Sequence, residues 1–473
     1  MRKQLVLFLG FITSISSFAQ VENPEESYSF SLEEAINFAL EHNRMIRNAS
    51  LDIEAAEKQK WETTATGLPQ INANIDYQRW LKQQVQLLPA AAFDNTQSTI
   101  DVVETYFDGA VRNSTPVNVP QGFIPVRFGT KQNVNATATL SQLIFDGSYL
   151  VGLQSAKVYL QISQNAKLKT DLEVKQAVIN AYGNVLLAEE SMAIFEKNIE
   201  VIEKNLNETQ KIYENGLTEE ENVEQLQITL SGLQSNLNNT ERLHKIAYQM
   251  LNIHLGLDVN TDTSVTDDLE ALAVQNINNN LLETDFNVEN TIDYQIAEND
   301  KISKELLVKL EKSKALPSLT AFVNGAYMGN SDEFTFLDRD QQWFGSSLLG
   351  VSLNIPIFSS MQRHAATQRA KINLEKAENN LTETQQQLKL QIENAKSNYQ
   401  FAIEDYEIKK ENLSLAERIE QKNQTKFFEG ISTSFDLRQA QTQLYTAQQE
   451  FLQAMLDVIT AKAELEKVTN QTI

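Results

Sequence analysis

Side chains that could do chemistry are few and scattered in this sequence. The chain has 473 residues and no cysteine, which excludes cysteine catalysis, a disulfide scaffold and a zinc ribbon. Its four histidines form no His-x-x-x-His pair and accompany no nucleophile motif; they are His42, His244, His254 and His364. His244 and His254 fall on a heptad pattern, where polar residues more often tune packing than bind ligands. We therefore expect a protein that is not an enzyme, with no bound metal and no cofactor.

The charge balance is strongly acidic. The chain has 40 basic and 63 acidic side chains, which give a net charge of −23. Nucleic-acid binding needs a basic face, so a nucleic-acid partner is excluded. On helices this acidic, carboxylates are more typical of a solvated surface than of a catalytic pair.

The first residues have the features of a signal peptide. Residues 2–3 are basic, residues 5–12 are apolar, and residues 17–19 form a small-x-small site, so we expect cleavage after Ala19. No later stretch has eighteen consecutive apolar residues. If the exported chain enters a membrane, it must do so with strands.

The elements that would position any functional side chain are long helices. No proline occurs between Pro125 and Pro317, and none after Pro356. The chain also repeats itself with an offset of 214 residues: the segment that ends at Gly216 matches the segment that ends at Gly430.

A heptad pattern follows each of these glycines. Apolar residues between 437 and 468 step three and four positions without a break, and the pattern recurs 214 residues earlier. Each half is therefore expected to form a helical hairpin, with first arms at 149–215 and 361–429 that are roughly 100 Å long. Gly216 and Gly430 would make the turns. The first helix of the mature chain is expected to start at a capping box formed by Ser31 and Glu34.

Four stretches alternate between apolar and polar residues with period two. They lie at 71–77, 134–140, 319–327 and 349–353, and each is about as long as a membrane-crossing strand. Aromatic residues near one end fit a membrane-interface girdle; they are Trp80, Trp343, Tyr77 and Tyr327. An ordinary half-buried sheet is the alternative. Four strands cannot close a barrel alone, so lipid-facing strands require an oligomer, either a dimer with 8 strands or a trimer with 12.

The order of these features resembles the TolC-like outer-membrane efflux proteins over nearly the whole mature chain. The resemblance rests on an ordered set of short motifs: Ser31-Leu32-Glu33-Glu34-Ala35-Ile36, Leu68-Pro69, Leu316-Pro317, Tyr213-x-x-Gly216, Phe427-x-x-Gly430, and Ser434-Phe435-Asp436-Leu437 with Gln439-Ala440-Gln441. The departures are Phe427 in place of tyrosine and Arg44 near a position where the family often has proline.

The resemblance implies a mainly α fold with a β-barrel part: a trimeric α/β barrel in which two internal repeats each give a coiled-coil hairpin and two transmembrane strands per protomer. The implied organisation is a signal peptide at 1–19, a first repeat at 20–257 with an outer loop at 81–130 and a tip near 213–222, a linker or equatorial region at 258–290, and a second repeat at 291–473 with an outer loop at 329–342 and a tip near 427–436.

The resemblance also implies a function and a set of site residues. The function is an outer-membrane exit duct of a tripartite efflux or type I secretion system. The expected partners are two further copies of the chain, a periplasmic adaptor, an inner-membrane transporter and outer-membrane lipid. The gate candidates at the tips are Asp436, Gln439, Asn222, Glu221, Phe427 and Tyr213, and the turns at Gly216 and Gly430 would dock the adaptor.

Two other functions fit part of the pattern. A periplasmic adaptor also uses a long helical hairpin, but it would have one hairpin between compact glycine-rich β domains. An exported coiled-coil scaffold without its own pore would have the heptads but no membrane strands.

Overall fold

A computed structural model describes residues 27–93, 96–107 and 121–470, and the expected signal peptide lies outside the described residues. The chain divides into two compact units. The helical unit comprises Met1–Gln59, Ser155–Glu305 and Ala370–Ile473, and the sheet unit comprises Lys60–Gln154 and Leu306–Arg369.

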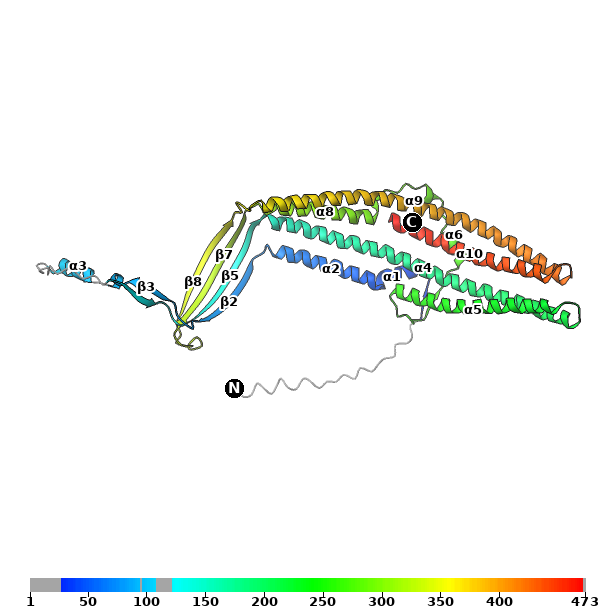
Figure 1. Cartoon of the computed structure of the whole chain (residues 1–473), viewed down its shortest axis with the longest axis horizontal. Coiled ribbons are helices and arrows are strands. Elements are labelled where there is room, and N and C mark those ends of the chain that lie inside the picture. The colour runs from blue at the N-terminus through cyan, green and yellow to red at the C-terminus, as the bar shows by residue number, and fades with distance from the viewer. Residues whose placement is uncertain (1–26, 94–95, 108–120, 471–473) are drawn as a thin grey trace, which may run out of the picture. The chain divides into compact units, whose positions relative to one another are not determined.

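The long helices form where the heptads predict them (Figure 1). The elements of the first half are α1 (Leu32–His42), α2 (Arg44–Ala65), α4 (Gly147–Glu214) and α5 (Glu220–Leu255), and those of the second half are α8 (Ile292–Ser313), α9 (Gln362–Phe428) and α10 (Ser434–Thr469). Apolar heptad residues such as Leu251, Leu437 and Val458 are buried, because the seam of each hairpin faces its partner helix. The predicted mainly helical fold with additional strands is confirmed, as is the capping box of Ser31 and Glu34.

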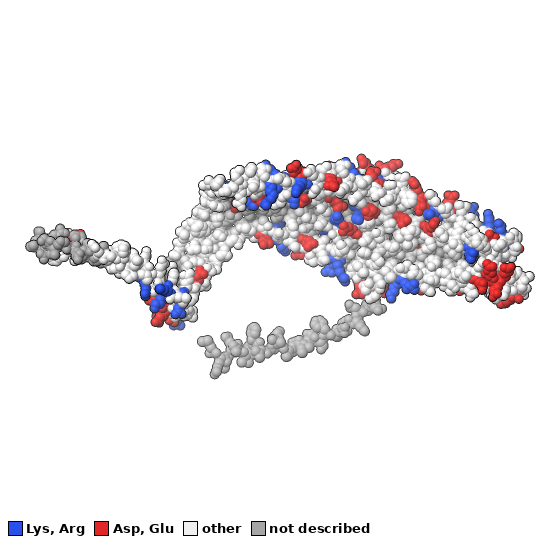
Figure 2. Space-filling model, in the orientation of Figure 1, with Lys and Arg blue, Asp and Glu red and all other residues white. Residues whose placement is uncertain are grey.

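The sheet unit contains one four-stranded antiparallel sheet in the order β2-β5-β7-β8. Its strands are β2 (Gln70–Arg79), β5 (Gln132–Asp146), β7 (Ser318–Ser331) and β8 (Trp343–Asn354). The four strands carry only three charged residues, Asp76, Arg79 and Asp146. Figure 2 accordingly shows few charged side chains over the strands on the face in view.

The two outer segments differ from the expected loops. The segment 81–130 contains β3 (Val85–Pro89), paired antiparallel with β4 (Phe123–Arg127), together with η1 (Ala90–Phe93) and α3 (Thr96–Tyr106). The second loop, expected from residue 329, begins only after Ser331, because β7 continues to pair with β5 up to that residue.

Asn43 joins the end of α5 to the start of α2. Its amide Nδ2 donates to the carbonyl oxygen of His254 over 2.7 Å, and its Oδ1 accepts from the backbone N–H of Met45 over 2.7 Å. One side chain thus satisfies a carbonyl at one helix end and an N–H at another. Arg44 is the first residue of α2, a position where proline is favoured in other helices. The cap formed by Asn43 starts α2 without that proline.

The expected linker at 258–290 is built from short elements. They are β6 (Thr263–Val265), α6 (Leu269–Gln275), α7 (Asn280–Glu283) and η2 (Val288–Asn290), and β6 pairs in parallel with β1 (Tyr28–Phe30). The Asp and Asn residues that suggested a loop act as caps: Asp268 accepts from Ala271 N–H, and Asn287 accepts from Glu289 N–H.

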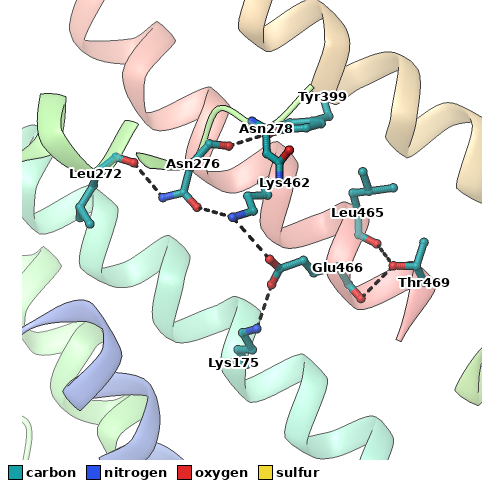
Figure 3. A network of polar contacts seen from close by, with 9 residues as sticks. All are labelled: Lys175, Leu272, Asn276, Asn278, Tyr399, Lys462, Leu465, Glu466 and Thr469. Carbon is teal, nitrogen blue, oxygen red and sulfur yellow. Dashed lines mark hydrogen bonds and ion pairs between the residues drawn. The ribbon is translucent and has the colours of Figure 1, made fainter. Parts of the chain in front are cut away.

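A partly buried polar network fastens this segment to the long helices (Figure 3). Glu466 of α10 accepts from Lys175 of α4 over 2.8 Å and lies 3.7 Å from Lys462. The Lys462 ammonium in turn donates to Asn276 Oδ1 over 3.2 Å, and Tyr399 of α9 donates to the Asn276 carbonyl over 2.6 Å. Because two long helices contact Asn276 directly and α4 joins the network through Glu466, Asn276 fixes the segment at this level of the helical unit.

The hydroxyl of Tyr182 attaches α4 to the short elements, and its removal tests how much this contact contributes to stability. It is fully buried, 2.9 Å from the Phe30 carbonyl and 2.8 Å from Asp267 Oδ2. Removing it takes one donor from the Phe30 carbonyl and the Asp267 carboxylate, and it takes the acceptor of the Asp267 backbone N–H. Tyr182→Phe should therefore lower the free energy of unfolding by about 1–3 kcal/mol. Thermal unfolding followed by circular dichroism measures this. The control is Tyr159→Phe, at a half-exposed position of α4. Equal stability of the two variants would contradict the stabilising role of the Tyr182 hydroxyl.

Candidate functional site

The register of the sheet places its apolar residues on one face. One row across the four strands is Ile71, Leu140, Val323 and Leu349, and the row nearest the strand ends is Tyr77, Val134, Gly329 and Trp343. The adjacent residues, which point to the other face, give rows such as Asn72, Thr139, Asn324 and Leu348. The sheet therefore has one apolar face and one mostly polar face.

The apolar face is exposed in the described chain. Ile71 and Leu349 are each 75% exposed, and Ile75 is 74% exposed. Large apolar residues this exposed, side by side on several strands, mark a surface that meets another protein or a lipid phase.

Aromatic rings gather at one end of this face. The ring of Tyr77 lies 5.9 Å from Phe334 and 6.1 Å from Phe336, and Phe336 lies 6.3 Å from Trp343. Of the four expected interface aromatics, Tyr77 and Trp343 share a row, and Tyr327 lies one row away on the same face. Trp80 follows the end of β2, and its backbone N–H donates to the carbonyl oxygen of Lys131. The sequence pattern does not indicate Phe334 and Phe336 as interface residues, because they lie in a turn where apolar and polar residues do not alternate.

The sheet also has two free edges among the described residues. β2 pairs only with β5, and β8 pairs only with β7. Because each neighbouring pair is antiparallel, β2 and β8 run in opposite directions. Each edge presents a row of unpaired backbone groups that can pair with another chain.

The two hairpin turns have the same geometry. Gly216 and Gly430 adopt positive φ angles of 71° and 74°. Their N–H groups donate to the carbonyls of Tyr213 and Phe427, over 2.7 and 3.0 Å. The next residues, Leu217 and Ile431, donate five residues back, which completes a Schellman motif at each tip. The aromatic-x-x-Gly spacing therefore sets the turn through the backbone.

Asp436 closes a capping box at the start of α10. Its Oδ2 accepts from the N–H of Thr433 over 3.1 Å, from the Thr433 hydroxyl over 2.7 Å and from the Ser432 hydroxyl over 3.1 Å. These hydrogen bonds, chiefly those from Thr433, hold the pKa of the Asp436 carboxyl below its usual value. The acid is therefore ionised at neutral pH and engaged with its own helix end. The Thr-x-x-Asp spacing could have revealed this role in the sequence.

The two tips contact each other through polar side chains. The Ser434 hydroxyl of α10 donates to Asn222 Oδ1 of α5 and lies 3.4 Å from Gln225 Oε1. Asn222 also donates to Thr218 over 2.7 Å, and Glu221 accepts from Gln225 over 2.8 Å. Of the expected gate residues, only Asn222 takes part in a hydrogen bond between the tips.

Acidic side chains gather around the first tip (Figure 2). They are Glu214, Glu219, Glu220, Glu221 and Glu224, and all are exposed. Gln439 is also exposed. No group of three or more His, Cys, Asp or Glu side chains within residues 27–93, 96–107 and 121–470 is arranged to hold a metal ion. In the same ranges, no helix has the length and hydropathy to span a membrane.

The fold is similar to solved outer-membrane proteins. VceC from Vibrio cholerae matches with a TM-score of 0.67 and 13% identity, over 93% of this chain and 95% of that chain. The CmeC channel of Campylobacter jejuni matches with a TM-score of 0.69 and 14% identity, over 93% and 85%. The open state of the MtrE channel of Neisseria gonorrhoeae matches with a TM-score of 0.65 and 16% identity, over 93% and 88%.

The comparison with curated protein sequences gives no match. A family model described as outer membrane efflux protein matches two segments, residues 35–257 and 303–471, and each contains one complete helical hairpin. These two segments make up most of the chain, and the sheet and hairpins have the fold of outer-membrane channels. The chain therefore belongs to the outer membrane efflux protein family.

Proposed function

We propose that three copies of this chain assemble into one exit duct, which accepts cargo from an inner-membrane transporter through a periplasmic adaptor. Members of the family act as outer-membrane components of tripartite efflux systems, and this chain is an outer-membrane efflux channel. The observation that carries the proposal is the sheet with one exposed apolar face and two free edges.

Assembly follows from the free edges. In lipid, every backbone N–H and C=O must be paired within the protein, so an open four-stranded sheet is not tolerated. Because β2 and β8 run in opposite directions, β8 of one copy can pair antiparallel with β2 of the next copy around a rotation axis. Three copies then close a twelve-stranded sheet with its apolar face toward lipid. The rings of Tyr77, Tyr327, Trp80 and Trp343 would lie at the membrane interface.

The segments 20–257 and 291–473 act as two equivalent repeats, joined by the equatorial region 258–290. Each contributes two strands and one hairpin to the duct. Residues 1–19 direct export as a signal peptide and are removed by cleavage after Ala19.

The hairpin tips form the periplasmic gate. Three copies of Asp436 near one axis would repel one another and attract cations. Asn222 and Ser434 join the tips within one copy, while Glu221 and Gln439 are exposed beside them. Phe427 and Tyr213 set the turns through their carbonyls, and the turns at Gly216 and Gly430 present the tips to the adaptor.

The number of chains in the complex is the first test. Native mass spectrometry of the detergent-purified protein should give the mass of three mature chains. Two chains would give eight strands and replace the trimer by a dimer. A water-soluble monomer would contradict the duct and favour an exported scaffold.

Two neighbouring leucines test which face meets lipid. Leu349 lies on the apolar face and Leu348 on the opposite face of the same strand. Leu349→Lys should destabilise the membrane-inserted protein by about 2–4 kcal/mol, because it places a charge in hydrocarbon. Leu348→Lys should be tolerated, since that face would line the duct. Folding yield in lipid vesicles and heat-modifiable gel mobility measure both variants. A greater loss for Leu348→Lys would reverse the assignment of the faces.

Channel recordings in planar bilayers test the gate. We expect the purified protein to conduct poorly at rest and to prefer cations. Asp436→Asn removes the charge but keeps an acceptor for the cap, whereas Asp436→Ala removes both. If the charge acts at the gate, both substitutions should change the resting conductance more than Asp457→Ala, further along α10. An effect confined to Asp436→Ala would assign the residue to capping alone, and an anion-preferring open pore would contradict the proposal.

A further inference from the structure

The apolar row on β8 continues past the end of the strand. Its members on the strand, which share a face because they are spaced two residues apart, are Leu349, Val351 and Leu353. Strand pairing ends at Asn354, but Ile355 and Ile357 keep the same spacing and are 56% and 89% exposed. The exposed apolar row therefore extends beyond the sheet, at the end opposite to the aromatic row.

The segment between β8 and α9 also exposes large apolar side chains. Phe358 is 82% exposed and Met361 is 67% exposed. Ser360 and Met361 adopt positive φ angles of 47° and 65°, which are uncommon for residues other than glycine. Met361 thus keeps a bulky apolar side chain at a position that glycine would occupy with less strain. Exposed side chains of this kind, next to the apolar row, indicate a surface that meets an apolar phase.

Basic side chains follow this segment directly. The sequence has no acidic residue between Asp340 and Glu375, although the whole chain has 63 acidic residues. The first two turns of α9 contain Arg363 and Arg369 instead. The start of α9 is therefore locally basic in a strongly acidic chain.

Arg363 lies against the exposed apolar segment. Its Nη2 donates to the carbonyl oxygen of Ile357 over 3.3 Å, which holds the guanidinium beside that residue. A guanidinium has five N–H groups and binds phosphate through two of them, so Arg363 can keep this bond and still bind phosphate oxygens. A phosphate-binding group thus lies next to side chains that suit acyl chains.

The end of α8 adds positive charge nearby. Ser318 at the start of β7 pairs with Asn354 at the end of β8, so α8 ends close to where α9 begins (Figure 1). Lys312 and Lys314 at the end of α8 are exposed, and Glu311 lies 2.8 Å from Lys314. The two helix ends at this side of the sheet therefore carry more basic than acidic side chains.

We propose that the helix-side rim, formed by Ile357, Phe358, Met361, Arg363 and Arg369, binds anionic phospholipids of the membrane. The apolar side chains lie among the acyl chains, and the arginines bind the headgroup phosphate. The proposal rests on the proposed function, because that function places the apolar row of β8 in lipid.

The charges of the rim select the headgroup. A zwitterionic headgroup carries an amine, which would need a carboxylate partner, and the rim has basic residues without an acidic one. An anionic headgroup such as that of phosphatidylglycerol has no such amine. The continuity of the apolar row with the exposed face of the sheet favours lipid over a protein partner as the occupant.

Lipid quenching tests the rim in the full-length protein. The chain has no cysteine, so Phe358→Cys introduces a single thiol, which is labelled with fluorescent bimane. The protein is reconstituted into phosphatidylcholine vesicles that contain nitroxide-labelled phosphatidylglycerol or nitroxide-labelled phosphatidylcholine. Phosphatidylglycerol should quench the label at a mole fraction that is lower by roughly fivefold for each arginine that contacts the headgroup. Equal quenching by the two lipids, or no quenching by either, would overturn the proposal; the second outcome would show that another chain covers the rim.

Matched variants separate the rim from a general effect of charge. Leu337→Cys lies in the turn between β7 and β8, at the other end of the sheet, where the native side chain is 86% exposed. A label there should show no preference for phosphatidylglycerol. In the protein labelled at position 358, Arg363→Gln should reduce the preference roughly fivefold, whereas Arg339→Gln should leave it unchanged. Equal losses in the two arginine variants, or no loss with Arg363→Gln, would contradict the assignment of Arg363.

The label position itself has a second check. Ile357→Cys replaces the neighbouring exposed side chain and should give the same lipid preference as Phe358→Cys. A preference at only one of the two positions would contradict a shared lipid-binding rim.

The quenching result can be told apart from the function on which the rim rests. If phosphatidylglycerol is preferred but the complex does not contain three chains or does not conduct, the rim stands and the duct assignment is wrong. If three chains assemble and conduct but both lipids quench equally, the duct stands and the rim does not select anionic lipid.

Discussion

A strand edge in lipid cannot be left unpaired, and this constraint explains more of the structure than any other. The four strands form an amphipathic sheet whose apolar residues, such as Ile75 and Leu349, have no cover within the described chain. Alone in water such a sheet exposes too much apolar surface, and alone in lipid it exposes the edges of β2 and β8. The proposed assembly with further copies would resolve both difficulties at once, because it would pair the edges and leave the apolar face for the membrane.

The helical unit depends on different contacts, which are those between its long helices. Heptad seams hold each hairpin together. Single side chains join elements that are distant in the sequence. Asn43 connects α5 to α2, and Asn276 receives contacts from α9 and α10. The two hairpins also differ in their capping. Thr433 and Asp436 cap α10 through side chains, whereas Glu219 at the start of α5 makes no such bond.

Most of the regular elements could be predicted because their periods are long and uninterrupted. The heptads located both hairpins to within two residues at the arm ends, and alternation located all four strands. The segment 258–290 could not be predicted in the same way. Its elements are three to seven residues long, too short for a period to show, and its Asp and Asn residues indicate caps and loops alike. The role of Asp436 shows a similar ambiguity, since an acid at a helix start fits both a gate and a capping box.

The sequence by itself determined which residues are apolar, where the helices turn and where the strands lie, because these properties depend on neighbours along the chain. Only the tertiary structure decided which surfaces meet. The strand order places β5 of the first half against β7 of the second, and so puts Tyr77 and Trp343 in one row. It also places the buried amide of Asn205 between the hairpins, where a heptad pattern alone would predict apolar packing. Such pairings depend on contacts between residues hundreds of positions apart, which local periodicity does not encode.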